Sequence, residues 1–120
     1  SEEEVMEYAL LLYSREEDLP ERMSDADREA FYADFGEFNE ALRKAGAFKG
    51  AQRLKTVDTA TSVRLREGEV VHPDGPFAET RESLAGLFVI DVEDLDQALH
   101  WASRIPSARI GTVEVRPIDY

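Results

Sequence analysis

Two segments of the chain are apolar along nearly their whole length, Met6 to Tyr13 (MEYALLLY) and Leu84 to Val92 (LAGLFVIDV). Both are short for a helix, and the second is rich in valine, isoleucine and phenylalanine, which favour strands. A strand that is apolar on both faces is usually buried between two layers. We therefore expect these segments to be the two central strands of a sheet. Gly86, inside the second, indicates a bulge or the close approach of another group.

A helical period begins after Ser24 and ends at Gly46. The Ser24 hydroxyl can cap the free N–H groups of the first turn, and a glycine in the left-handed conformation ends many helices. Apolar residues recur between these points at every third or fourth position, as expected of a helix with one face on a sheet. This stripe consists of Phe31, Phe35, Phe38, Leu42 and Ala45.

A second helix is predicted between Asp94, which can cap its first turn with Gln97 three residues later, and Pro106, which ends it. Its expected buried stripe is Leu95, Ala98, Leu99, Ala102 and Ile105. His100 and Trp101 lie off this stripe, so we expect them at the surface or in an interface.

The remaining segments complete the pattern of an α+β protein. Ala47 to Lys55 is predicted as a strand near an edge of the sheet. Thr112 to Ile118 is predicted as a final strand with one face more apolar than the other. Thr61 to Arg66 alternates and returns as Glu69 to His72, which predicts an inserted β-hairpin. The resulting order, βαββαβ with an inserted hairpin, is that of a ferredoxin-like sandwich.

Two helices can cover only one face of such a sheet, yet the central strands are apolar on both faces. Something else must therefore cover the other face. The simplest candidate is a second copy, so we expect a homodimer whose sheets pack face to face. The alternative is that the hairpin and loops fold back over the open face.

Composition narrows the class of protein. With 120 residues the chain has the length of one domain, and we expect residues 1–5 to be an N-terminal extension, Met6 the natural start, and residues 6–120 the domain. The net charge of −12 disfavours nucleic-acid binding. The absence of cysteine excludes thiol nucleophiles. No apolar run or leader predicts contact with a membrane, so a cytoplasmic protein is expected.

Polar residues suited to chemistry concentrate around the Gly75-Pro76 turn. His72 and Asp74 could converge on a ligand, with His72 as general acid or base. The alternatives are that His72 is a surface histidine and that Asp74 holds its own turn through backbone hydrogen bonds. Glu79 and Glu82 could each supply a carboxylate to the same site.

Three further residues are candidates for binding a ligand. Arg64 and Arg116 lie on the polar faces of their strands and could bind a carboxylate, or could form ordinary salt bridges. Tyr8 could add a hydroxyl, or could pack in the core. No phosphate-binding glycine loop or serine-hydrolase elbow is present, and the acidic residues near His72 lack an established metal-ligand spacing. Neither a cofactor nor a metal is therefore expected.

The run Asp74 to Thr80 (DGPFAET), with the IDV of Ile90 to Val92 and a terminal VRP at Val115 to Pro117, resembles the DGPF family of YCII-related proteins. Supporting matches upstream extend this resemblance over nearly the whole chain. The resemblance implies a dimeric α+β barrel, in agreement with the strand pattern.

The wider YCII group resembles small-molecule enzymes of the muconolactone-isomerase and dehydrochlorinase kind, with a histidine and an aspartate in the barrel cleft as the catalytic pair. This sequence has no histidine in its first helix, and it has Ile105-Pro106 where that group has Asp-Pro. The pair is therefore not carried over. In their genomic company, DGPF proteins also resemble partners of extracytoplasmic-function sigma factors, which implies a role in regulation.

Two hypotheses of function follow. In the first, a cleft between the sheets of a homodimer accepts a small anionic ring compound, which Arg64 or Arg116 orients. His72 or Asp74 then moves a proton, as in an isomerase or lyase that needs no cofactor. In the second, the protein is a non-catalytic regulatory module that binds a protein partner, such as a sigma factor, through its acidic face at 16–29.

Overall fold

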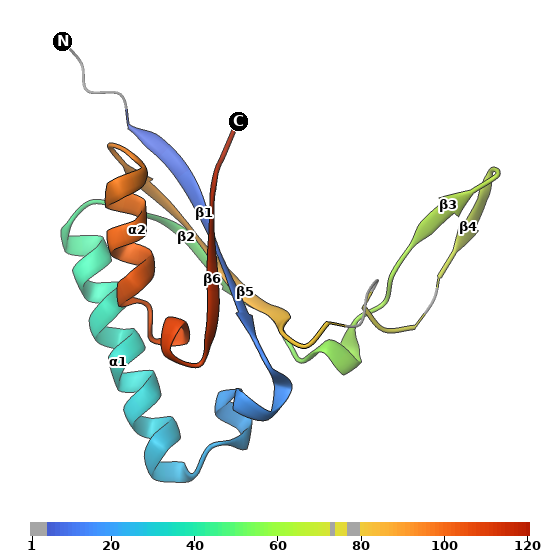
Figure 1. Cartoon of the computed structure of the whole chain (residues 1–120), viewed down its shortest axis with the longest axis horizontal. Coiled ribbons are helices and arrows are strands. Elements are labelled where there is room, and N and C mark those ends of the chain that lie inside the picture. Colours follow the sequence, from blue (N-terminus) through green and yellow to red (C-terminus); the bar gives the residue numbers. More distant parts are fainter. Residues whose placement is uncertain (1–4, 73, 77–79) are drawn as a thin grey trace.

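The computed structural model describes residues 5–72, 74–76 and 80–120, and it contains a four-stranded antiparallel sheet with two helices on one side (Figure 1). The main elements are β1 (Met6–Ser14), α1 (Asp25–Lys44), β2 (Phe48–Arg53), β3 (Arg64–Arg66), β4 (Glu69–Val71), β5 (Ser83–Val92), α2 (Leu95–Arg104) and β6 (Gly111–Pro117). Strands lie in the order β2-β5-β1-β6, with β1 and β5 central and β2 at an edge. The predicted ferredoxin-like α+β fold is confirmed.

The first helix begins and ends where the sequence predicts. The Ser24 hydroxyl accepts a hydrogen bond from the Asp27 amide at 3.1 Å, which satisfies one of the free donors of the first turn. Gly46 follows the helix with a φ of 71°, the left-handed conformation that ends it. Phe31, Phe38 and Leu42 are buried. Within the described ranges, no helix is both long and apolar enough to cross a membrane.

The second helix corrects part of the prediction. Trp101, expected at the surface or in an interface, is buried and meets Phe38 edge to face with ring centroids 6.0 Å apart. Leu95 and Leu99, expected in the core, are each 48% exposed. The buried face therefore follows Ala98, Trp101, Ala102 and Ile105, with the helix rotated from the predicted stripe. Burial of the indole removes more apolar area from water than burial of one leucine.

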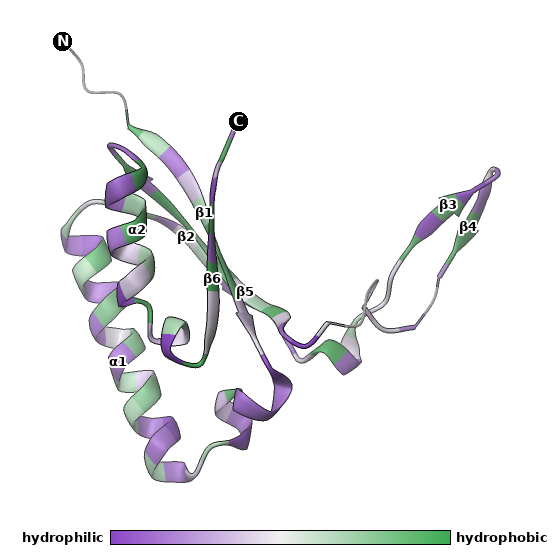
Figure 2. Ribbon diagram, viewed as in Figure 1, coloured by the Kyte–Doolittle hydropathy of each residue, from purple (hydrophilic) through white to green (hydrophobic). Residues whose placement is uncertain are grey.

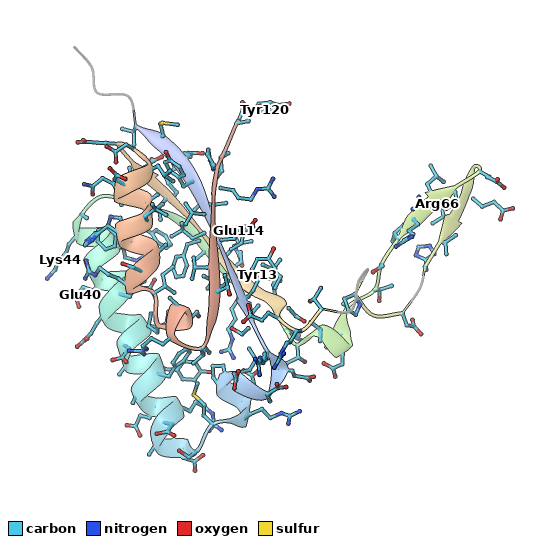
Figure 3. The ribbon with its side chains drawn as sticks, viewed as in Figure 1. Tyr13, Glu40, Lys44, Arg66, Glu114 and Tyr120 are labelled. Carbon is cyan, nitrogen blue, oxygen red and sulfur yellow. The ribbon has the colours of Figure 1, made fainter. Side chains whose placement is uncertain are left out.

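The sheet has one covered face and one open face. Directly opposed residues of antiparallel strands share a face, so Leu10 and Phe88 lie beneath the helices. The opposite face, which we call the open face, has at its centre half-exposed apolar residues of β1 and β5, namely Ala9, Leu11, Tyr13, Leu87 and Val89. On this face the Tyr13 hydroxyl donates to the Glu114 carboxylate of β6 at 3.4 Å (Figure 3).

Strands β3 and β4 form a separate hairpin, and we call residues 61–72 the arm. The arm projects from the side of the sheet opposite the helices and does not fold back over the open face (Figure 1). The radius of gyration is consequently 16.6 Å, against about 13.5 Å for a compact chain of this length. The predicted hairpin is confirmed, although β3 is shorter than expected and Thr61 joins only by an isolated bridge to Asp74.

Gly86 has both features that its place in a strand predicted. The pairing of β1 with β5 shifts register beside it, and a β-carbon at Gly86 would lie 2.8 Å from the Gln52 carbonyl oxygen of β2. Gly86→Ala should therefore push β2 from β5 and lower the free energy of unfolding by about 1–3 kcal/mol. Urea denaturation followed by circular dichroism would measure this change.

A matched control is Gly36→Ala, at an exposed position of α1 where an added β-carbon meets nothing within 4 Å. Because alanine favours a helix over glycine, this variant should be more stable by about 0.5–1 kcal/mol. If both alanines stabilise the protein, the close approach at Gly86 does not restrict the sheet.

Candidate functional site

A cavity of about 340 Å³, open on one side, lies between α1 and the β2–β5 half of the sheet. Its size is at the lower end of the range for ligand pockets, roughly 300–1,000 Å³. The apolar wall includes Leu12, Leu19 and the aromatic rings of Phe31, Phe35 and Phe88. We call this space the α1 cavity.

Local sequence explains why the cavity is empty of side chains. Ala51 and Gly86, at neighbouring places on β2 and β5, have little or no side chain to fill the space beneath α1. Phe35 stacks on Phe88 with ring centroids 6.4 Å apart, and Phe31 meets Phe35 edge to face at 5.2 Å. The aromatic residues therefore form a wall instead of collapsing into the gap.

Three of the polar residues that line the α1 cavity are two serines and an asparagine from different parts of the chain. Ser14 ends β1, Asn39 belongs to α1, and Ser107 lies after α2; Ser14 is only 3% exposed. Within the described part of the chain, the side chains of Ser14 and Asn39 make no hydrogen bond. Their polar atoms can therefore orient a molecule bound against the apolar wall.

The opening of the α1 cavity carries a cluster of three side chains, Glu21, Tyr32 and Arg53, which we call the mouth cluster. The Arg53 guanidinium donates a hydrogen bond to the Tyr32 hydroxyl at 2.8 Å and forms an ion pair with the Glu21 carboxylate. Its central carbon is 5.4 Å from the Tyr32 ring centroid. The Tyr32 hydroxyl accepts from Arg53, so its own proton remains available to another acceptor.

The ion pair of the mouth cluster is accessible to solvent. The Arg53 and Glu21 side chains are 58% and 43% exposed. Exposed pairs of this kind contribute about 0–1 kcal/mol, because water screens the charges and the side chains lose freedom. An incoming anion can therefore replace the Glu21 carboxylate at small cost.

Three sequence-predicted residues of the hairpin region, Arg64, His72 and Asp74, do not line this cavity. His72 and Arg64 are exposed on the arm, and Asp74 is exposed at its base. Glu79 lies outside the described residues. Among the described residues, no three histidine, aspartate or glutamate side chains form a group that could hold a metal ion.

The two predicted residues of the main sheet lie on opposite faces. Tyr8 is 3% exposed in the helix-side core, with its hydroxyl 3.8 Å from the Met6 sulfur. Arg116 lies exposed on the open face of β6, directly opposite Ala9 of β1. Neither residue lines the α1 cavity, so the structure does not bring the described members of the predicted set together in one chain.

The Asp74-Gly75-Pro76 turn has a visible structural role. The Gly75 amide donates to the Ala60 carbonyl at 2.8 Å, and the Ser62 hydroxyl donates to the Gly75 carbonyl at 2.8 Å. Gly75 has a φ of 89°, which favours glycine. The turn thus closes the base of the arm through its backbone, whereas the Asp74 carboxylate makes no hydrogen bond with a described residue.

Sequence reasoning missed the mouth cluster. Tyr32 adjoins a buried position of α1, and Arg53 lies in a strand that was predicted only for its apolar residues. The available signal is the group of small residues, Ala51 and Gly86, that faces the aromatic side of α1. Such a group predicts a gap in packing only when the pairing of β2 with β5 is known.

The architecture is that of a small ferredoxin-like α+β protein with a hollow beneath its first helix. The model of the YCII-related domain family matches residues 6–119, so the chain belongs to the YCII-related family. An uncharacterized protein of Rhizobium meliloti (strain 1021) is 35% identical over 115 residues, which is 94% of this chain and 92% of that relative. The resemblance to YCII-related proteins seen in the sequence is confirmed.

Gly75→Ala should open the base of the arm, because the alanine side chain disfavours a φ of 89°. The alanine should destabilise the closed turn by about 1 kcal/mol, so hydrogen exchange at the residue 75 amide should accelerate roughly fivefold. Exchange followed by NMR would measure this. Gly68→Ala, which strains the arm's tip at a φ of 80°, should leave that amide unchanged. Equal exchange in wild type and Gly75→Ala would contradict the role assigned to the turn.

Proposed function

We propose that this protein binds a small, largely apolar molecule with one acidic group in the α1 cavity. The observation that carries the proposal is an apolar, ring-lined cavity whose opening holds a guanidinium in a weak ion pair. The apolar part of the ligand lies against Phe31, Phe35 and Phe88. Its acidic group replaces Glu21 beside Arg53, which can form two parallel hydrogen bonds to a carboxylate.

The lining of the α1 cavity supports the binding of a ligand better than it supports catalysis. The lining of the α1 cavity contains serine, asparagine and tyrosine groups that can orient a ligand, but neither His72 nor Asp74 is among them. Their catalytic roles stay predictions, as does a ligand cleft between two sheets. The cavity proposed here lies instead on the helix side of a single sheet, within one chain.

The alternative hypothesis, a regulatory module that binds a partner through the acidic face at 16–29, receives less support. Several carboxylates of this face already have cationic partners within the chain. The pairs are Glu16 with Arg22, Glu21 with Arg53, and Asp25 with Arg28. This internal pairing lowers the charge available to attract a basic partner.

A thermal-shift screen of aromatic and alicyclic carboxylates, each paired with its neutral amide, tests the binding proposal. A ligand that binds only the folded state raises the melting temperature, so carboxylates should raise it more than amides. Arg53→Gln should weaken binding of the best carboxylate at least tenfold by titration calorimetry. The proposal is wrong if no carboxylate shifts the melting temperature or if amides act equally well.

Arg66→Gln is the matched control for this experiment. It makes the same substitution near the end of the arm, outside the cavity lining (Figure 3). Its affinity for the same carboxylate should equal that of wild type. An equal loss in both variants would indicate attraction by overall charge and not a site at Arg53.

We also propose that two copies pair through their open faces. The centre of this face is apolar, and its margin holds both signs of charge, including Lys49 between Glu7 and Asp91 at 3.6 Å from each. A surface of this kind can be self-complementary about a two-fold axis. Burial of the half-exposed side chains of β1 and β5 stabilises the pair.

Light scattering coupled to size exclusion tests the pairing. At micromolar concentration the measured mass should be twice the 13.6 kDa of one chain. A monomeric mass under these conditions would exclude a stable homodimer.

A further inference from the structure

The arm is an amphipathic ribbon. In its register Leu65 opposes Val70, and these two residues share one face with Val63. The other face holds Arg64 opposite Val71 and Arg66 opposite Glu69. We call the first of these the apolar face of the arm; Figure 2 shows hydrophobic residues on both of its strands.

None of the described residues covers the apolar face. Val63 and Leu65 are each 63% exposed, and Val70 is 57% exposed. The arm pairs with neither edge of the four-stranded sheet. Because an isolated two-stranded hairpin is only marginally stable in water, this ribbon needs a surface to pack against. The hydrogen bonds at Gly75 join the two segments of its base to each other but cover none of these side chains.

We propose that the apolar face of the arm packs on a second copy of this chain, so that each protomer of the dimer embraces the other. The arm projects from the side of the sheet that the open face occupies (Figure 1). A copy docked on the open face therefore lies alongside the arm. Because such a pair has two-fold symmetry, the contact occurs twice, once from each arm.

The area needed for a stable dimer supports this arrangement. Four strands at ~4.8 Å spacing and ~7 residues long present roughly 450 Å² in projection, whereas a stable interface buries about 800 Å² per partner. The apolar face of one arm, two strands wide and ~5 residues long, adds roughly 170 Å². Each protomer buries the apolar face of its own arm and a similar area where the partner's arm packs. Together with the open face, these areas come close to what a stable interface buries per partner.

The charge of the arm favours a protein surface over a polyanion. Its arginines, Arg64 and Arg66, are matched in number by Glu67 and Glu69. Binding to nucleic acid or to an anionic lipid surface needs an excess of cations, which this ribbon lacks. The three exposed side chains of its apolar face are suited instead to an uncharged protein surface.

The test compares two neighbouring valines that point to opposite faces of the arm. Val70→Glu places a carboxylate in the proposed contact, whereas Val71→Glu makes the same change on the polar face, opposite Arg64. By sedimentation equilibrium, Val70→Glu should raise the dissociation constant of the dimer at least tenfold. Val71→Glu should leave it within about twofold of wild type. Circular dichroism would confirm that both variants retain the sheet and helices.

This inference rests on the homodimer proposed above, and its failure is distinguishable from failure of the dimer. If wild type is monomeric, both fail. If wild type is dimeric and the dimers of Val70→Glu and Val71→Glu have equal dissociation constants, the homodimer is supported but the arm's apolar face is not its contact. Hydrogen exchange provides a check without mutation. Amides of β3 and β4 should be protected above the dissociation constant and exchange faster after dilution below it.

Discussion

The structure depends on one constraint, namely that two helices cover only one face of the four-stranded sheet. Burial of Leu10, Ile90, Leu42 and Ile105 between these layers supplies the core. The same arrangement leaves the central strands, β1 and β5, half-exposed on the far side. Since apolar side chains fill both faces of these strands, the single chain buries only part of the surface that its sequence provides for burial.

The same two layers also produce the α1 cavity. The C-terminal half of α1 packs tightly, because Phe38 meets Phe88 and Trp101 edge to face. Toward its N-terminus the helix lies over small residues of β2 and β5, which cannot fill the space. A cavity lined by rings is stable when aromatic contacts hold its wall, as between Phe35 and Phe88. The C-terminal half of α1 therefore packs in the core, whereas the part nearer its N-terminus borders the proposed binding site.

Much of this fold is predictable from sequence, because its signals are local. The cap at Ser24, the end of α1 at Gly46, and the order of strands all follow from residue type and period. The rotation of α2 was not predictable in this way, since Leu99 and Trp101 are both apolar and lie on adjacent faces of the helix. Which of them is buried depends on the space beside Phe38, a contact between distant parts of the chain.

The candidate site was less accessible to sequence reasoning for the same reason. Arg53 meets Tyr32 and Glu21, which are 21 and 32 residues away, so no short motif contains the mouth cluster. The motif that does stand out, at Asp74 to Pro76, suggests chemistry because polar residues such as His72 and Asp74 gather around it. In the structure its backbone closes the base of the arm, through Gly75, Ala60 and Ser62.

A conspicuous motif can thus reflect geometry as much as chemistry. The turn at Gly75 joins the two segments of the arm at its base, through Ala60 and Ser62. If these segments separated, the arm would lose the strand pairing that places its apolar side chains on one face. A closed base preserves that pairing. The contact proposed for the arm therefore depends on a backbone conformation that glycine readily adopts.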